Sequence, residues 1–240
     1  MLRVIPMSAP LTVTSRMKGP ANSVGRDGDW APGLQKARIY EQILLDIILG
    51  ELAPMHVLDE RALAGRYAAG VAGVREALGR LALEGLVVRR PRVGTIVAPL
   101  DIREIEQAFE VRYMLEGRTA ALAARNAKPQ DIKTITQAFE GAEAAIAASD
   151  FRAMLAMDRA FHRAVAFATN NLALARFVVS LQNVATRFWI WEMEKQSQED
   201  QLKDVALHRA LGDAIAAHDP DAAETAALKL VGEPPSASRG

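Results

Sequence analysis

Residues 74–97 read VREALGRLALEGLVVRRPRVGTIV, and within this stretch a helical pattern gives way to two short β-prone segments. The helical part has one apolar side and ends at Gly85, a residue that suits a helix C-terminus. Segments 86–89 and 95–97 are β-prone, and residues 90–94 form a turn between them. The apolar side of the helix consists of Val74, Ala77, Leu78 and Leu81. The stretch therefore predicts a helix followed by a two-stranded hairpin.

Two more helices are expected upstream. Apolar residues recur at helical spacing from Leu34, and Gly50 is a suitable C-terminal stop. Asp59 can cap a second, short helix, and a turn rich in glycine and alanine, residues 68–73, leads into the third helix. Three helices followed by a hairpin are the order of a winged helix-turn-helix, in which the hairpin is the wing.

The chain after Pro99 reads as helix throughout. Asp101, Asp150 and Asp219 can each cap a helix N-terminus, and Pro220 suits a first helical turn. We expect six amphipathic helices that pack as a bundle of about 130 residues. Their expected spans are 101–127, 130–148, 150–169, 171–195, 199–217 and 220–231.

The fold class expected from these patterns is mainly α, with two domains. The winged helix-turn-helix covers residues 34–100, and the helical bundle covers 101–232. Residues 1–33 mix proline, glycine, serine and scattered charges without periodicity, so we expect a flexible tail there, and a second one over 233–240.

The composition narrows the class of protein. Half of the 240 residues are hydrophobic, which allows a sizeable core, and the absence of cysteine excludes disulfides and thiol chemistry. No run of about 18 apolar residues occurs, and the N-terminal residues lack the apolar core of a secretory signal. We therefore expect a cytoplasmic protein without a membrane span.

Charge is unevenly distributed along the chain, although the formal net charge is zero. Residues 61–92 contain seven arginines and two glutamates, whereas residues 101–240 contain 16 Lys and Arg against 20 Asp and Glu. A basic segment of this kind is typical of contact with nucleic acid, and random clustering on a solvated surface is the alternative.

A winged domain that reads DNA needs cations on the exposed face of its third helix and at its hairpin tip. Arg75 and Arg80 meet the first requirement, and Arg61 begins the second helix, where a side chain can reach a phosphate. The hairpin contributes Arg89, Arg90 and Arg92, with Gly94 closing the turn and Thr95 beside it. Salt-bridged surface arginines are the alternative for each.

These residues also carry a resemblance. Residues 40–97 resemble the DNA-binding domain of the GntR family, through DERALA at 59–64, VREAL at 74–78, LALEGLV at 81–87 and RPRVGTIV at 90–97. The resemblance implies DNA binding by Arg61, Arg75, Arg80, Arg90, Arg92, Gly94 and Thr95. Where the family has Ser-Arg-Thr-Pro, this chain has Gly70-Val71-Ala72-Gly73, so we expect the fold to persist with altered DNA affinity or sequence preference.

A second group of residues falls within the bundle. Asp158 and His162 are four residues apart, so they share a helix face, and His208 lies on a later helix. A carboxylate and imidazoles from facing helices are common ligands of Zn²⁺ and other transition metals. Ordinary core or surface histidines are the alternative.

The bundle resembles the FCD effector domain of the FadR-like branch of the GntR family, through EVRYMLE at 110–116, DRAFH at 158–162 and LHRAL at 207–211. In relatives, one Asp and three His hold a metal that helps to bind an organic acid. The fourth position is Leu230 here, and His218 is a poor substitute. Two alternatives remain: a three-ligand Zn or Ni site at Asp158, His162 and His208, or a metal-free pocket in which these residues and Arg112 bind the effector.

The expected function is a homodimeric transcription regulator, not an enzyme, that binds a double-stranded DNA operator under the control of a small organic or sugar acid. A regulator-derived metal-binding or enzymatic protein with weakened specific DNA binding is the alternative. The aromatic residues Phe188, Trp189 and Trp191 are expected to serve core or subunit packing rather than a cofactor.

Overall fold

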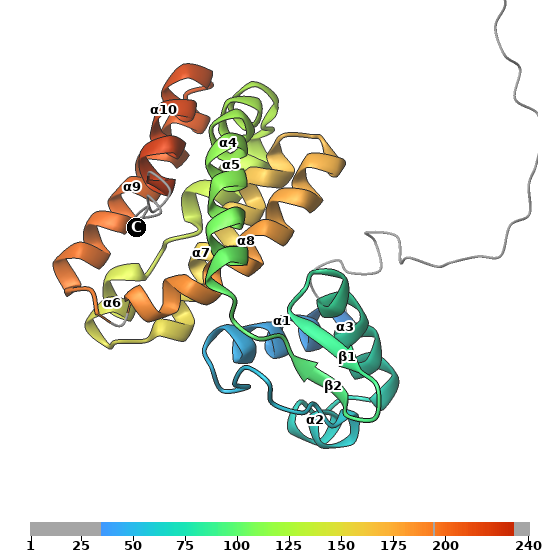
Figure 1. Ribbon diagram of the computed structural model, residues 1–240. Helices are drawn as coiled ribbons and strands as arrows, with labels where there is room; N and C mark the ends of the chain where they lie inside the picture. The colour runs from blue at the N-terminus through green and yellow to red at the C-terminus, as the bar shows by residue number, and fades with distance from the viewer. Residues whose placement is uncertain (1–34, 194, 233–240) are drawn as a thin grey trace, which may run out of the picture.

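The computed structural model describes residues 35–193 and 195–232, with side chains described up to Arg187 and again from Lys195. The predicted tails and the aromatic side chains of Phe188, Trp189 and Trp191 lie outside what it describes. The described chain forms two units, a small N-terminal unit with a two-stranded hairpin and a larger bundle of helices (Figure 1).

The N-terminal unit has the predicted order of three helices and a hairpin. Asp59 caps the second helix, since its Oδ1 accepts a hydrogen bond of 2.7 Å from the backbone N–H of Ala62. Gly85 ends the third helix with a φ of +76°, a conformation that glycine adopts without strain. The elements are α1 (Gln35–Ile48), α2 (Glu60–Arg66), α3 (Val71–Leu83), β1 (Val87–Arg90) and β2 (Gly94–Val97), the two strands being antiparallel.

The structure corrects where the third helix begins. The expected turn over residues 68–73 is shorter, because α3 starts at Val71 with Gly70 as its N-cap. Gly73 therefore lies in the first turn of α3, where a Cβ atom would meet Ile39 Cδ1 of α1 at 3.0 Å. The small residue at this position allows α1 and α3 to pack closely.

The bundle contains seven helices among the described residues, one more than predicted. The expected helix over 130–148 is two helices, because Gly141 adopts a φ of +86° between them. Asp101, Asp150 and Asp219 cap helices as expected, and Pro220 occupies a first turn. The helices are α4 (Ile102–Asn126), α5 (Pro129–Gln137), α6 (Ala142–Ala147), α7 (Phe151–Ala168), α8 (Leu172–Met193), α9 (Gln198–Ala216) and α10 (Pro220–Val231).

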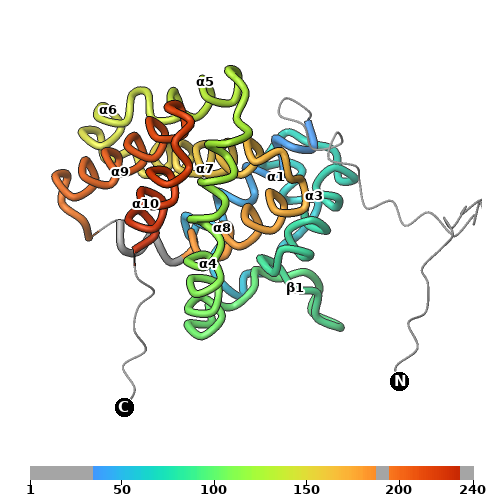
Figure 2. The backbone as a smooth tube through the Cα atoms, turned by 90° about the horizontal axis from the view of Figure 1, so that it is seen from above, coloured from blue at the N-terminus to red at the C-terminus, as the bar shows by residue number. Residues whose placement is uncertain are grey.

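Helices α7 and α8 lie between the N-terminal unit and the outer helices α9 and α10 (Figure 2). Leu155 and Phe151 of α7 pack against the core of the N-terminal unit, and the polar side chains that cross the boundary are donors whose partners in that unit are acceptors. Arg152 contacts Asp46 and Glu51, Arg159 contacts Glu41, Asn183 contacts Tyr40 and Glu84, and Arg187 donates to the Ala98 carbonyl. We call these contacts the interdomain seam.

None of the described helices is long and apolar enough to cross a membrane.

Candidate functional site

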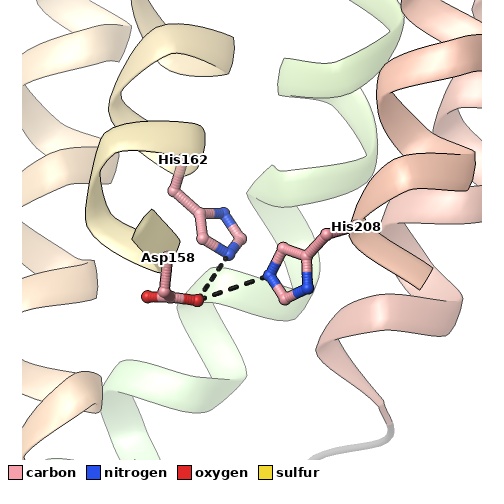
Figure 3. Close-up of side chains that lie close together, drawn as sticks. All are labelled: Asp158, His162 and His208. Carbon is pink, nitrogen blue, oxygen red and sulfur yellow. Dashed lines mark ion pairs between the residues drawn. The ribbon is translucent and has the colours of Figure 1, made fainter. Parts of the chain in front are cut away.

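Three side chains that are distant in sequence converge inside the bundle. Asp158 and His162 come from α7, and His208 comes from α9 (Figure 3). The Asp158 Oδ1 atom lies 3.6 Å from His162 Nε2 and 3.3 Å from His208 Nε2. One ligand atom from each residue lies within 4.8 Å of the others, which is close enough for all three to bind one metal ion.

The hydrogen bonds of His208 leave one ring nitrogen available. Its Nδ1 atom lies 2.9 Å from the carbonyl oxygen of Asp204, so Nδ1 carries the proton that this contact needs. Its Nε2 atom is buried and, despite the nearby Asp158 Oδ1, makes no well-formed hydrogen bond. A backbone carbonyl that fixes the ring and leaves the other nitrogen free is the usual support of a metal-bound histidine.

Burial and mutual attraction set the pKa values in this cluster. Burial lowers the pKa of His162 to about 4, so its ring is neutral near pH 7. Burial also opposes the charged form of Asp158, but attraction to His162 and His208 outweighs it and holds the pKa of Asp158 below its usual value. For His208, burial lowers the pKa, and attraction to the Asp158 carboxylate, whose Oδ1 is 3.3 Å from Nε2, more than compensates, so the pKa is raised.

A cavity of about 40 Å³ adjoins the three residues. Leu230 from α10 lines it, so the apolar residue at the family's fourth ligand position is beside the cluster. His218 lies elsewhere, with its Nδ1 2.7 Å from the Ala124 carbonyl. The other lining residues are Arg112, Leu155, Gln182, Thr186, Asp204 and Val231.

Sequence reasoning missed three polar residues of this site, Gln182, Asp204 and Thr186. Gln182 Nε2 donates a 3.2 Å hydrogen bond to Asp158 Oδ2 from α8. Asp204 holds His208 through its carbonyl, and its carboxylate Oδ2 is 3.4 Å from His208 Nδ1. The spacing of four between Asp204 and His208 could have revealed the second, whereas no pattern in α8 sets Gln182 apart from its neighbours.

Arg112, expected to bind the effector, lines the cavity but has a partner. Its Nε and Nη2 atoms each lie 3.1 Å from Glu116 Oε1 on the next turn of α4, and both side chains are buried. The pair leaves little net charge at this wall of the cavity. An anion that binds here must compete with Glu116 for the guanidinium.

The predicted DNA-contacting arginines lie mostly on the exposed surface of the N-terminal unit. Arg61, Arg89, Arg90 and Arg92 are exposed. Arg75 on α3 is also exposed, and its Nη2 atom makes a 2.7 Å ion pair with Glu60 Oε2 at the start of α2. The surface formed by the start of α2, the exposed face of α3 and the wing is therefore rich in cations.

The structure contradicts the prediction that Arg80 lies on this exposed face. Its guanidinium stacks over the Tyr40 ring at 4.4 Å, and its Nε atom is 3.0 Å from Glu84 Oε1. Tyr40 and Glu84 belong to the interdomain seam, so Arg80 faces the bundle. Helical position alone could not show this, because residues 75 and 80 differ by about 140° around the helix.

The wing turns through residues with positive φ. Arg92 has a φ of +65° and Gly94 a φ of +105°, so the turn places an arginine in a conformation that side chains disfavour. Thr95 is half-buried, and its carbonyl accepts a 2.8 Å hydrogen bond from the Leu58 N–H. The Arg92 side chain therefore projects from the hairpin tip, whereas the Thr95 backbone connects the wing to the segment before α2.

Comparison with known proteins agrees with this architecture. Residues 35–97 match the bacterial regulatory proteins of the gntR family, and residues 107–232 match the FCD domain. The chain is 30% identical to the probable D-xylose utilization operon transcriptional repressor of Paenarthrobacter nicotinovorans. The match extends over 191 residues, which is 79% of this chain and 82% of that protein. It is 29% identical to the HTH-type transcriptional regulator LutR of Bacillus subtilis, over 75% of this chain and 90% of LutR.

Solved structures show the same fold. Escherichia coli McbR/YncC superimposes with a TM-score of 0.69 at 21% identity, over 82% of this chain and 92% of that one. The curated relatives are transcription regulators, which decides against the enzyme alternative for Asp158, His162 and His208. The chain belongs to the GntR family of bacterial transcription regulators, with an N-terminal winged helix-turn-helix and a C-terminal FCD domain.

Proposed function

We propose that this regulator binds its DNA operator as a homodimer and that a small organic acid, held with a divalent metal ion at Asp158, His162 and His208, controls the binding. The observation that carries the proposal is the buried cluster itself: a carboxylate and two imidazoles converge, and the Nε2 atom of His208 has no hydrogen-bond partner.

The donor set fits a transition metal. Two nitrogen ligands and one oxygen ligand suit Zn²⁺ or Ni²⁺, and His162 is already neutral near pH 7. The bound ion would supply a Lewis-acidic position to which a carboxylate of the effector coordinates. The fourth ligand position of the family holds Leu230, whose side chain cannot coordinate a metal. The fourth coordination site of the ion would therefore be open to water or effector.

The protein's own residues would orient the acid. Gln182 holds Asp158 from α8, and Asp204 holds His208 within α9, so both ligands are fixed before metal binds. Arg112 lies on the cavity wall, where a carboxylate could exchange places with Glu116 as its partner. Without metal, these same groups would form a purely hydrogen-bonding pocket.

The names of relatives favour a sugar-derived effector, and one of them favours a sugar acid. One relative is named for a D-xylose utilization operon, and another, 24% identical, is the gluconate operon transcriptional repressor of Bacillus licheniformis. A sugar acid has a carboxylate for the metal and hydroxyl groups for Gln182 and Thr186, which both line the cavity. Because the cavity has only about 40 Å³, the side chains around it must move apart when such a molecule binds.

DNA binding would use the exposed arginines of α2, α3 and the wing. Arg75 is paired with Glu60 across α2 and α3, so a phosphate or a guanine must compete with this carboxylate for its guanidinium. A single reading helix has a small contact area, and two-fold pairing of two chains on two half-sites would supply the missing affinity.

The test is a titration of operator DNA, taken from the region flanking the protein's own gene, at one salt concentration. The wild type is compared with Arg75→Ala and His208→Ala, each with Zn²⁺ and a panel of sugar acids, or with chelator. We expect Arg75→Ala to lose about 1–3 kcal/mol of DNA affinity. We expect His208→Ala to bind DNA normally but to respond to neither metal nor acid. A wild type that is insensitive to every acid tested would contradict the effector proposal.

A further inference from the structure

A second and much larger cavity lies outside the cluster at Asp158. It lies between α1 of the DNA-binding domain and helices α7 and α8 of the FCD domain, and its volume is about 730 Å³. Pockets of about 300–1,000 Å³ are typical of small-molecule sites. The cavity at His208, by contrast, has about 40 Å³, little more than the volume of one water molecule, which is about 30 Å³.

The lining of the large cavity carries excess positive charge. Arg38 on α1 and Arg159 and Arg163 on α7 are cations, and Glu41 is the one acidic residue among the described lining residues. Arg159 is engaged by Glu41 at 3.0 Å and by Asn183. Among the described residues, Arg38 and Arg163 have no ion-pair partner, and Glu41, which pairs with Arg159, is the one carboxylate of the lining.

Of these two arginines, Arg163 has the side chain that is more buried and more fixed in position. Its guanidinium stacks over the Phe167 ring at 4.8 Å, and among the described residues it makes neither an ion pair nor a hydrogen bond. The side chain is half-buried, whereas Arg38 is exposed. A half-buried cation that makes no ion pair with the described residues, at the wall of a cavity, is a favourable position for an anionic group.

The rest of the lining is mostly apolar. It includes Ala37 and Leu45 from α1, Ala156 and Ala160 from α7, and Val179 from α8. A fully hydrated inorganic ion gains nothing from such a surface. An organic molecule that carries one anionic group on an apolar body would satisfy Arg163 and bury its body against these side chains.

We propose that this interdomain cavity is a second ligand site, which binds an organic monoanion with an apolar body through Arg163. Gln182 lines both cavities, so it separates this site from the cluster at Asp158. The second site needs no metal. Its occupant would touch Arg159 and Asn183, which also contact α1 and α3, so we expect binding to change DNA affinity.

The probe is 8-anilinonaphthalene-1-sulfonate, an anion on an apolar body whose fluorescence rises on transfer from water. Chelator-treated protein is titrated with it, and octanoate is then added as a competitor. Arg163→Met removes the cation, and Ala160→Trp fills the cavity at an exposed position that tolerates a larger side chain. The matched controls are Arg125→Met and Ala144→Trp, both at exposed positions of the FCD domain outside this cavity.

We expect octanoate to displace the probe, Arg163→Met to weaken probe binding by about tenfold, and Ala160→Trp to abolish it, because a charge-assisted contact and the binding volume are lost. Both controls should bind like the wild type. The proposal is overturned if the probe does not bind, or if the two cavity variants bind it as the controls do. It is also overturned if Ala160→Trp converts a dimer into a monomer, since the cavity would then be a contact between two copies of the chain.

Discussion

His208 is the residue on which the proposed metal site depends most. Its Nδ1 atom is tied to the Asp204 carbonyl, and its Nε2 atom points toward Asp158, 3.3 Å from Oδ1 (Figure 3). This contact is not a well-formed hydrogen bond. A buried polar nitrogen without a partner costs free energy unless something binds it. A metal ion would relieve that cost, and Leu230 limits the protein to three ligands.

Leu230→His should supply a fourth ligand. Leu230 lines the cavity of the cluster, so an imidazole there could reach the ion. We expect Zn²⁺ to bind at least about tenfold more tightly, which is about 1.4 kcal/mol. At saturating Zn²⁺ the same difference of about 1.4 kcal/mol appears in the free energy of unfolding, which raises Tm by about 3–6 °C. Calorimetric titration and thermal melts of chelator-stripped proteins measure both, and equal binding by the two proteins would place position 230 outside the coordination sphere.

Zinc affinity should rise with pH through the pKa of His208. That pKa is raised, so the metal-free protein carries a proton on His208 which the metal must displace. The pKa of His162 is about 4, so this ring does not compete with metal above pH 5. Below the pKa of His208, log K should therefore rise by about one per pH unit. A pH-independent affinity between pH 5 and 6, below the ordinary histidine pKa of 6.5, would show that His208 is not a ligand.

Arg92→Gly should weaken DNA binding through loss of charge without destabilising the hairpin of the wing. Arg92 holds a φ of +65°, which glycine adopts freely, so the substitution should not destabilise the hairpin. If Arg92 neutralises one phosphate, its loss should flatten the plot of log K against log salt by about one unit for each protomer. Arg118→Gly in the FCD domain provides a charge-matched control. An unchanged salt slope for Arg92→Gly would assign Arg92 to solvent.

At the scale of elements, the start of α3 departs most from the family. The usual Ser-Arg-Thr-Pro is replaced by residues that offer no side-chain donor, and the N-cap Gly70 forms no side-chain cap. The backbone N–H groups of the first turn remain available for a phosphate. The packing of α1 against α3 also limits the size of the residue at position 73, because a Cβ atom at Gly73 would lie 3.0 Å from Ile39 Cδ1.

Restoring the family residues should tighten DNA binding in two steps. The triple change Gly70→Ser, Val71→Arg and Ala72→Thr returns a cap and donors to the helix start, and we expect tighter operator binding with little loss of stability. Adding Gly73→Pro brings ring carbons to where Ile39 Cδ1 is 3.0 Å away, so we expect the quadruple variant to melt below the triple one. Anisotropy titrations and thermal melts test both. Unchanged or weaker DNA binding by the triple variant would mean that this turn has adapted to other contacts.

At the scale of the whole molecule, the interdomain seam connects the cluster to the DNA-binding domain. Gln182 holds Asp158, and its neighbour Asn183 donates to Glu84 Oε2 at 2.7 Å and to the Tyr40 hydroxyl at 3.1 Å. Glu84 is the C-cap residue of α3. A shift of α8 that follows ligand binding at Asp158 would therefore move the end of the helix that carries Arg75.

Asn183→Leu should weaken the coupling between metal or effector and DNA. The variant removes the donors to Tyr40 and Glu84 and the acceptor of Arg159, but leaves the cluster and the exposed arginines in place. We expect near-normal zinc binding and a smaller change in DNA affinity on adding ligand, by about 1 kcal/mol or more of coupling free energy. Asn126→Leu, which removes an amide bonded to the Thr169 carbonyl within the FCD domain, is the control. Identical coupling in wild type and Asn183→Leu would exclude this route.

Local features of the fold were predictable from the sequence because they depend on neighbours in the chain. Helix periodicity, the caps at Asp59, Asp101, Asp150 and Asp219, and the hairpin turn each involve residues a few positions apart. The shared face of Asp158 and His162 follows from the helical repeat alone. The break at Gly141 was not predictable, because residues compatible with a helix continue on both sides of it.

The sequence by itself determined the order of helices and strands, the family motifs and which residue types could bind metal or DNA. Only the tertiary structure decided that His208 meets Asp158, that Gln182 supports it, that Arg80 faces the bundle, and that a cavity opens between α1, α7 and α8. The physical reason is that periodicity defines the apolar side of each helix, whereas the rotation and register between helices depend on how all side chains pack together.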